Sequence, residues 1–216
     1  MLEKMDSFFE ARLEDYDEHM LETIEGAKAF YPFTASQLPA FPFAKVLDLG
    51  CGTGLELAWY LEQNPSADVT GIDLSAGMLE RLQEKFAGRN LRLICGSYFD
   101  VPFGKEQYDA AVSVESLHHF TKDQKVPLYR KLHDALKPSG FLILTDYFAP
   151  SEAEENLYFS ELDRLKKAQG IDDDAFYHYD TPLTVQHEME ALLEAGFSQV
   201  TELARWKATH TLKAVR

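Results

Sequence analysis

The sequence predicts an α/β protein built on a doubly wound sheet with helices on both faces. Three observations support this fold class. A short apolar run at residues 46–49 leads into a glycine-rich turn and then into a helix-period pattern. A second short apolar run, at 68–73, follows after one helix length. Strand-like and helix-like segments then alternate through the rest of the chain, which is the pattern of βαβ units.

The later elements follow from hydrophobic periodicity and from the residues that end helices. Apolar side chains recur at three- and four-residue spacings in the helical segments, with glycine or proline at their ends. The predicted helices are 76–87, 127–137 and 184–195, and the predicted strands are 91–95, 107–114 and 141–147. Segments 198–205 and 207–215 indicate two adjacent strands at the end of the chain.

The turn after the first strand has glycine at three alternate positions, Gly50, Gly52 and Gly54. Glycine allows a tight turn and lets a ligand approach backbone amides, and the following helix N-terminus adds unpaired donors. Asp73 ends the second strand about 20 residues further on, which is the spacing of a ribose-binding carboxylate. Together these features predict a mononucleotide-binding unit.

Two details of the turn argue against a dinucleotide such as NAD. A dinucleotide turn places its third glycine three residues after the second, whereas this chain has Leu55 there and the third glycine at Gly54. Asp48 also precedes the turn, where a carboxylate would repel a pyrophosphate and attract an ammonium group. We therefore expect a ligand that carries a positive charge.

The run 48–54 resembles the first motif of class I methyltransferases that use S-adenosylmethionine, and the run 71–75 resembles their second. The resemblance implies a Rossmann-like, mostly parallel sheet closed by an antiparallel C-terminal strand pair. It implies S-adenosyl-L-methionine as cofactor and S-adenosyl-L-homocysteine as product, with the ammonium near Asp48 and the ribose on Asp73. The other implied cofactor contacts are Tyr16, Gly50, Cys51, Gly52, Gly54, Leu74, Met78, Ser97, Tyr98, Val114 and Glu115.

The adenine end of the site departs from the family pattern. The family usually has Gly-Asp after the third strand, with the acid reading the adenine amino group, but this chain has Gly96-Ser97. Tyr98 and the backbone are the alternative adenine contacts. Met78 follows Ser75 at the mouth of the site, so it is expected either to touch adenine or to join the core.

The first 34 residues have helix periodicity, which predicts an amphipathic helix over the sheet edge that is broken by Pro32 and Pro39. Tyr16-Asp17 resembles a pair that lies over the cofactor in many small-molecule methyltransferases. We expect residues 1–43 to form a helical segment covering the cofactor site and 44–216 to form the methyltransferase domain. An insertion at about 151–180 would shape the acceptor site, although its aromatic cluster at 176–179 could equally pack on itself.

His118 and His119 follow the fourth strand, in a segment that resembles the family's fourth motif beside the reactive methyl group. The reference pKa of histidine, about 6.5, suits proton removal at neutral pH, and general base catalysis contributes roughly 10²- to 10⁴-fold. We take both histidines as candidate catalytic residues. The alternative is that one ring is structural, capping the next helix or packing on the sheet.

Composition limits the partners of the chain. Its 216 residues suffice for one folded unit, and 36 acidic against 21 basic residues give a net charge of -15, which disfavours bulk nucleic acid and acidic membranes. Two cysteines, Cys51 and Cys95, indicate reduced thiols, and neither a signal peptide nor a membrane span is evident, so we expect a cytoplasmic protein. The acidic runs 152–155 and 172–174 lack histidines at ligand spacing and are expected to be exposed surface, so no metal is expected. The oligomeric state is open.

The function predicted from these patterns is in-line transfer of the sulfonium methyl group to a small-molecule acceptor, without a metal or a covalent nucleophile. One alternative is an enzyme that makes carboxy-S-adenosylmethionine, because residues 192–197 also resemble that group. The arginine that the group uses for the extra carboxylate would fall at Ala191, which counts against it. The other alternative is a non-catalytic adenosyl-binding protein.

Overall fold

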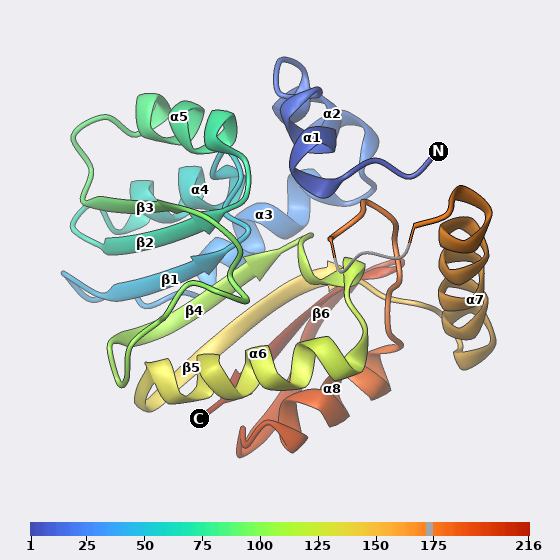
Figure 1. The fold of residues 1–216 in the computed structure, drawn as a ribbon. Helices are drawn as coiled ribbons and strands as arrows, with labels where there is room; N and C mark the ends of the chain where they lie inside the picture. Colours follow the sequence, from blue (N-terminus) through green and yellow to red (C-terminus); the bar gives the residue numbers. More distant parts are fainter. Residues whose placement is uncertain (172–174) are drawn as a thin grey trace.

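The computed structural model describes residues 1–171 and 175–216, and the described chain contains a seven-stranded sheet in the order β3-β2-β1-β4-β5-β7-β6 (Figure 1). The strands from β3 to β5 run parallel, and β7 is antiparallel to both of its neighbours. This confirms the predicted fold class. The strands are β1 Lys45–Leu49, β2 Asp68–Asp73, β3 Leu91–Cys95, β4 Tyr108–Val114, β5 Leu136–Tyr147, β6 Gln199–Trp206 and β7 Thr209–Val215.

Helices cover both faces of the sheet. The alternating side chains of β1 show this, because Val46 packs with α3, α4 and α5, whereas Leu47 packs in the cluster that holds α6 and α8. The strand order reverses between β1 and β4, and a doubly wound sheet binds its ligand at this switch point, at the carboxyl ends of the strands. The covering helices are α3 Ala27–Ser36, α4 Leu55–Gln63, α5 Ala76–Lys85, α6 Lys122–Ala135 and α8 Val185–Glu194.

The N-terminal region differs from its prediction. It forms three short helices, α1 Met5–Glu10, α2 Tyr16–Thr23 and α3, and Pro32 lies inside α3 rather than ending it. Proline forfeits one helical hydrogen bond, but the burial of Phe30 and Tyr31 beside it stabilises the helix through packing. The chain instead reverses at Gly26, which has a left-handed φ of 85° and lies so close to Trp206 that a Cβ would be 2.7 Å from the Trp206 Cβ.

Helix α6 begins at Lys122 rather than at Pro127, so its predicted start was wrong. Thr121 caps it, with a capping box in which the Thr121 hydroxyl accepts from the Gln124 N–H and the Gln124 side chain accepts from the Thr121 N–H. The predicted start would put Pro127 in the first turn, where proline is favoured, but this residue lies further along the helix. The helix also ends earlier than predicted, and β5 takes over from Leu136.

The insertion after β5 contains α7, Glu152–Gln169, which lies at one edge of the molecule (Figure 1). One part of the acidic run at 152–155 is not exposed surface, because Glu155 is buried and pairs with His187, their Oε1 and Nδ1 atoms 2.8 Å apart. The run 172–174 lies outside the described residues. No described helix is both long enough and apolar enough to cross a membrane.

Candidate active site

The glycine turn between β1 and α4 is held in a conformation that excludes side chains. Gly50 and Gly52 have φ of 73° and 48°, in the left-handed region, and a Cβ on Gly50 would lie 2.1 Å from the Ser116 Oγ. A Cβ on Gly52 would have more room, because the Tyr16 ring is the one group outside the turn that lies within 4 Å of it among the described residues. Gly54 caps α4 and faces Leu82 and Phe86, so packing alone explains this glycine, and its cofactor contact stays a prediction.

Asp73 is fixed in orientation by the turn that it faces. Its Oδ2 accepts a hydrogen bond from the Gly52 N–H at 2.9 Å, and its Oδ1 accepts from the Ser75 N–H at 2.9 Å. Each carboxylate oxygen retains a lone pair for a further donor. Burial raises the pKa of Asp73, and these backbone N–H groups offset part of that effect. The geometry leaves a preoriented acceptor at the carboxyl end of β2, where two ribose hydroxyls could donate.

Asp48 lies beneath the turn rather than in a cavity. Its side chain is buried, and both of its oxygens accept no hydrogen bond from the described N–H and O–H groups. Burial first, and the Glu56 carboxyl second, raise the pKa of Asp48 well above its ordinary value. Cys51 is buried against Gly71 in the same layer. An ammonium contact with Asp48 stays a prediction.

The N-terminal helices are tied to both cofactor motifs. The Thr53 hydroxyl donates to Asp17, whose other oxygen lies 2.7 Å from the Lys85 Nζ. The Ser75 hydroxyl donates to Glu10 at 2.5 Å. These contacts hold α1 and α2 against the carboxyl ends of β1 and β2.

Two cavities meet at the switch point. A narrow cleft of about 50 Å³ lies over the turn, and a larger cavity of about 1090 Å³ lies beside it under the N-terminal helices. Four side chains line both: Phe9, Tyr16, Glu115 and His119. Of the remaining predicted contacts, the cleft holds Gly50, Gly52, Asp73, Leu74, Met78 and Tyr98. Cys51, Gly54, Asp48, Ser97 and Val114 do not line either cavity.

The adenine-side candidates separate in the structure. The Ser97 hydroxyl accepts from the Phe99 N–H at 3.2 Å, within its own turn. Tyr98 lines the cleft with its hydroxyl 3.2 Å from the Ser116 Oγ. Met78 is buried and also lines the cleft, so it joins the core, and its contact with adenine stays a prediction.

His118 is clamped by carboxylates. Its Nδ1 lies 2.5 Å from Asp146 Oδ1 on β5, and its Nε2 lies 3.5 Å from Asp180 Oδ1. Burial lowers the pKa of His118, but Asp146 and then Asp180 outweigh it and leave the pKa well above the ordinary value. His118 is therefore an imidazolium at neutral pH.

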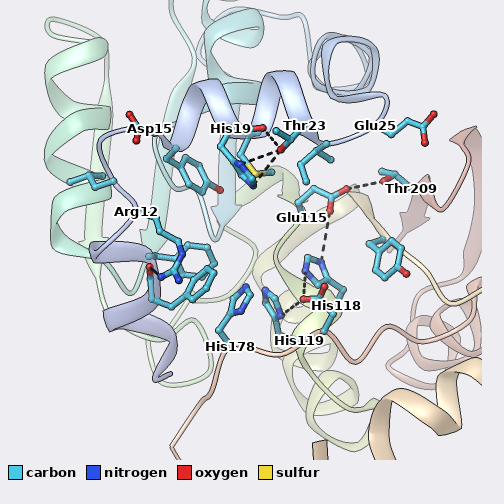
Figure 2. Close-up of a pocket in the computed structure, with 18 of the residues that line it drawn as sticks. Arg12, Asp15, His19, Thr23, Glu25, Glu115, His118, His119, His178 and Thr209 are labelled. Carbon is cyan, nitrogen blue, oxygen red and sulfur yellow. Dashed lines mark hydrogen bonds and ion pairs between the residues drawn. The ribbon is translucent and has the colours of Figure 1, made fainter. Parts of the chain in front are cut away.

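His119 differs from His118 in its protonation. Its Nδ1–H donates to the Tyr179 carbonyl at 3.2 Å and lies 3.3 Å from Asp180 Oδ1. Burial and the positive charge of His118 lower the pKa of His119, so the ring is neutral and its Nε2 carries a lone pair. Figure 2 shows His118, His119, His178 and Glu115 grouped at the cavity.

Glu115 has an unusual backbone for a non-glycine residue, with φ of 48°, and its side chain accepts from the Thr209 hydroxyl at 3.1 Å. Burial first, and the charge of Asp146 second, raise the pKa of Glu115 to about 7. This carboxyl group titrates at neutral pH at the junction of the two cavities.

Two groups of donor atoms are close enough to chelate a divalent cation: His118 with His119 and Asp180, and Glu115 with His118 and Asp146. Both groups need a lone pair on Nδ1 or Nε2 of His118. That ring is protonated, with Nδ1 facing Asp146 and Nε2 facing Asp180. In the first group, His119 Nδ1 lies 3.3 Å from Asp180 Oδ1 and donates to the Tyr179 carbonyl. Metal binding at either group would have to displace a proton from His118.

The chain matches the family model described as a methyltransferase domain over residues 46–140. It is 31% identical to the carboxy-S-adenosyl-L-methionine synthase of Citrifermentans bemidjiense over 70% of this chain and 67% of that protein. The chain belongs to the class I S-adenosylmethionine-dependent methyltransferases. This methyltransferase has S-adenosylmethionine as its cofactor.

Two further likenesses agree. The methyltransferase is 30% identical to the malonyl-[acyl-carrier protein] O-methyltransferase of Herminiimonas arsenicoxydans, over 82% of this chain and 61% of that one. The structure of human N-acetylserotonin methyltransferase in complex with SAM has the same fold, with a TM-score of 0.70 and 15% identity over 99% of this chain and 59% of that one. The match to the family model spans both cofactor motifs and the His118-His119 segment.

Sequence reasoning missed Asp180 and the contacts of Asp17 with Thr53 and Lys85. Asp180 lies at the end of the aromatic cluster 176–179, and no spacing rule connects it with His118 across the intervening chain. Its proximity comes from the Thr181 N–H, which donates to the His118 carbonyl at 2.8 Å. The aromatic cluster packs on rings of other segments, since the His178 ring stacks on Phe8 with the ring centroids 3.5 Å apart, and His178 also lines the large cavity.

Proposed function

We propose that this methyltransferase moves the methyl group of S-adenosylmethionine to a small-molecule acceptor that binds in the 1090 Å³ cavity. The observation that carries the proposal is the set of four side chains shared by the two cavities, because a methyl group passing between cofactor and acceptor must cross there. A volume of this size matches the roughly 300–1,000 Å³ of small-molecule sites.

In this proposal the cofactor lies along the cleft. Asp73 holds the ribose, and Leu74, Met78 and Tyr98 line the adenine end. The methionine part lies over Gly50 and Gly52, with its ammonium on the side of Asp48. The sulfonium then lies near Glu115, whose carboxylate offsets its positive charge.

His119 is the proton acceptor and His118 a positioning residue. The neutral His119 ring has its Nε2 lone pair unused by the described residues, and it lines both cavities. The acceptor atom forms a bond to the methyl carbon as the carbon–sulfur bond breaks, and the electron pair of that bond remains on sulfur. The acceptor's proton passes to His119, and His118 keeps Asp180 and the Tyr179 segment in place.

The carboxy-S-adenosylmethionine alternative keeps some support from the similarity to a synthase of that name. A carboxylated cofactor adds a negative charge, which needs a cation nearby. Among the described residues that line the cleft there is no lysine or arginine, and Glu115 is there instead. Ala191 is buried in the core between α8 and the sheet, so its position cannot supply that cation. These observations favour the plain methyl group.

The cleft is too narrow for a nucleoside cofactor as it stands, at about 50 Å³. Helices α1 and α2 close it through Asp17 and Glu10, so entry of the cofactor requires these helices to move.

The acidity of the chain disfavours bulk nucleic acid as substrate. We also propose a cytoplasmic location.

Calorimetric titration with S-adenosylmethionine and S-adenosylhomocysteine tests the proposal, alongside mass spectrometry of any nucleoside that copurifies. We expect both ligands to bind and the copurified cofactor to carry a methyl rather than a carboxymethyl group. Absence of binding by either ligand would remove the basis of the proposal. Binding without methyl transfer to any acceptor in a broad panel would favour a non-catalytic adenosyl-binding protein.

A further inference from the structure

The Asp180 carboxylate has a buried oxygen without a hydrogen bond. Oδ1 is enclosed and accepts no hydrogen bond from the residues that the structure describes, although His119 Nδ1 and His118 Nε2 approach to 3.3 and 3.5 Å. The rest of the side chain is 47% exposed on the wall of the large cavity. A donor that enters the cavity can therefore reach this carboxylate.

The wall around Asp180 has a net negative charge. Burial raises the pKa of both Asp146 and Asp180, but His118 outweighs it at Asp146, and His118 together with His119 outweighs it at Asp180, so both acids stay ionised. One imidazolium thus faces two carboxylates, and His119 contributes no charge. Glu115 adds a further partial negative charge at neutral pH. The reacting end of the cavity therefore attracts a cation and repels an anion.

The basic residues of the cavity do not offset this charge. Among its described lining residues the lysine and arginine positions are Arg12 and Lys207. Arg12 pairs with Glu3 at 3.3 Å, donates to the Phe8 carbonyl and stacks on the Phe8 ring. Lys207 pairs with Glu25. Each cation already has an acidic partner, so neither is free to offset the charge of Asp146 and Asp180.

The remaining lining favours an organic cation over a hydrated ion. Aromatic rings from separate segments line the cavity, and ring faces attract ammonium groups. These rings include Phe9, Tyr16, Tyr147 and Trp206.

We propose that the methyl acceptor is an amine that binds as its ammonium against the exposed side of the Asp180 carboxylate. This inference rests on the methyl transfer proposed above and names its substrate class. The ammonium gives one proton to His119 Nε2, which frees the nitrogen lone pair. The nitrogen then bonds to the methyl carbon, and the electron pair of the broken carbon–sulfur bond stays on sulfur. The products are the methylated ammonium, S-adenosylhomocysteine and one proton released from His119.

Calorimetry on the protein saturated with S-adenosylhomocysteine tests this. The probes are primary amines of increasing size. Each amine is compared with the alcohol and with the carboxylate that have the same carbon skeleton. We expect the ammonium of at least one skeleton to bind tenfold or more tightly than its alcohol and carboxylate. The substitution Asp180→Asn should weaken that ammonium by roughly 10- to 100-fold, the effect of losing a charge-assisted hydrogen bond, and leave S-adenosylhomocysteine affinity within about twofold.

Glu14→Gln is the matched control, because Glu14 lines the same cavity, is exposed and loses the same charge. It should change ammonium affinity by less than about twofold. The inference would be overturned if the alcohols or carboxylates bound as tightly as the ammonium compounds or more tightly, or if no ammonium compound bound in any series. It would also be overturned if the two substitutions had equal effects. Because S-adenosylhomocysteine binding is measured first, a failed cofactor site is distinguished from a wrong acceptor class.

Discussion

The pKa of Glu115 makes cofactor recognition depend on pH. In the free protein this carboxyl group has a pKa of about 7, so it is about one-tenth ionised at pH 6 and about nine-tenths at pH 8. S-Adenosylmethionine brings a positive sulfonium to the junction, whereas S-adenosylhomocysteine has a neutral sulfur and is otherwise alike. The affinity ratio of the two ligands therefore isolates the interaction of the sulfonium with Glu115.

The expected magnitude follows from the charges. A sulfonium within about 4–6 Å of the carboxylate is attracted by about 3–4 kcal/mol at an effective dielectric constant of 20. That attraction is enough to keep Glu115 ionised in the complex between pH 6 and pH 8. The ratio of S-adenosylmethionine to S-adenosylhomocysteine affinity should then rise about tenfold from pH 6 to pH 8. Binding of S-adenosylmethionine should release the proton that Glu115 carries in the free protein.

Isothermal titration at pH 6, 7 and 8, in buffers of different ionisation enthalpy, measures both the ratio and the proton release. The variant Glu115→Gln should have a flat ratio across this range, and Glu14→Gln should behave as the wild type. A flat ratio in the wild type, or the same slope in Glu115→Gln, would refute the placement of the sulfonium beside Glu115.

Three other predictions concern the site. Asp73→Ala should lower S-adenosylmethionine affinity by roughly 10²- to 10⁴-fold, since two charge-assisted hydrogen bonds of about 1.5–3 kcal/mol each are lost; unchanged affinity by calorimetry would sink the ribose assignment. Asp146→Asn leaves His118 without its buried partner and should cost about 3 kcal/mol, seen as a fall of roughly 6–12 °C in melting temperature. Because the folded pKa of Asp146 lies below 3.8, this difference should persist at neutral pH and shrink as the pH falls below that value; a pH-independent difference would contradict the ion pair. Dialysis against EDTA should leave cofactor affinity and methyl transfer unchanged, and activity lost and then restored by zinc would show that the histidines chelate metal instead.

The sequence predicts the sheet well because its signals are local. The glycine turn and the acid at Asp73 sit in a fixed spacing, and each buried strand is a short apolar run, so the order of elements was correct. The N-terminal helices were harder to predict. Pro32 is a strong local stop signal, but burial of its neighbours overrides it, and the break at Gly26 is set by Trp206 from the far end of the chain.

The acceptor side could be predicted only in part. His118 and His119 both line the large cavity, and their catalytic role stays a prediction. Their different charge states depend on Asp146 and Asp180, which come from β5 and from the segment after α7. Such long-range contacts leave no spacing signal in one sequence, so only the folded chain separates the neutral ring from the imidazolium.

In the proposed reaction the methyl group crosses at the junction where Glu115 and His119 lie. A crystal structure of the protein with S-adenosylmethionine would show whether it does. We expect the ribose hydroxyls on Asp73 and the sulfonium methyl group pointing past Glu115 toward His119 and the large cavity. A cofactor bound with its methyl group turned away from His119, or outside the cleft over the glycine turn, would contradict it.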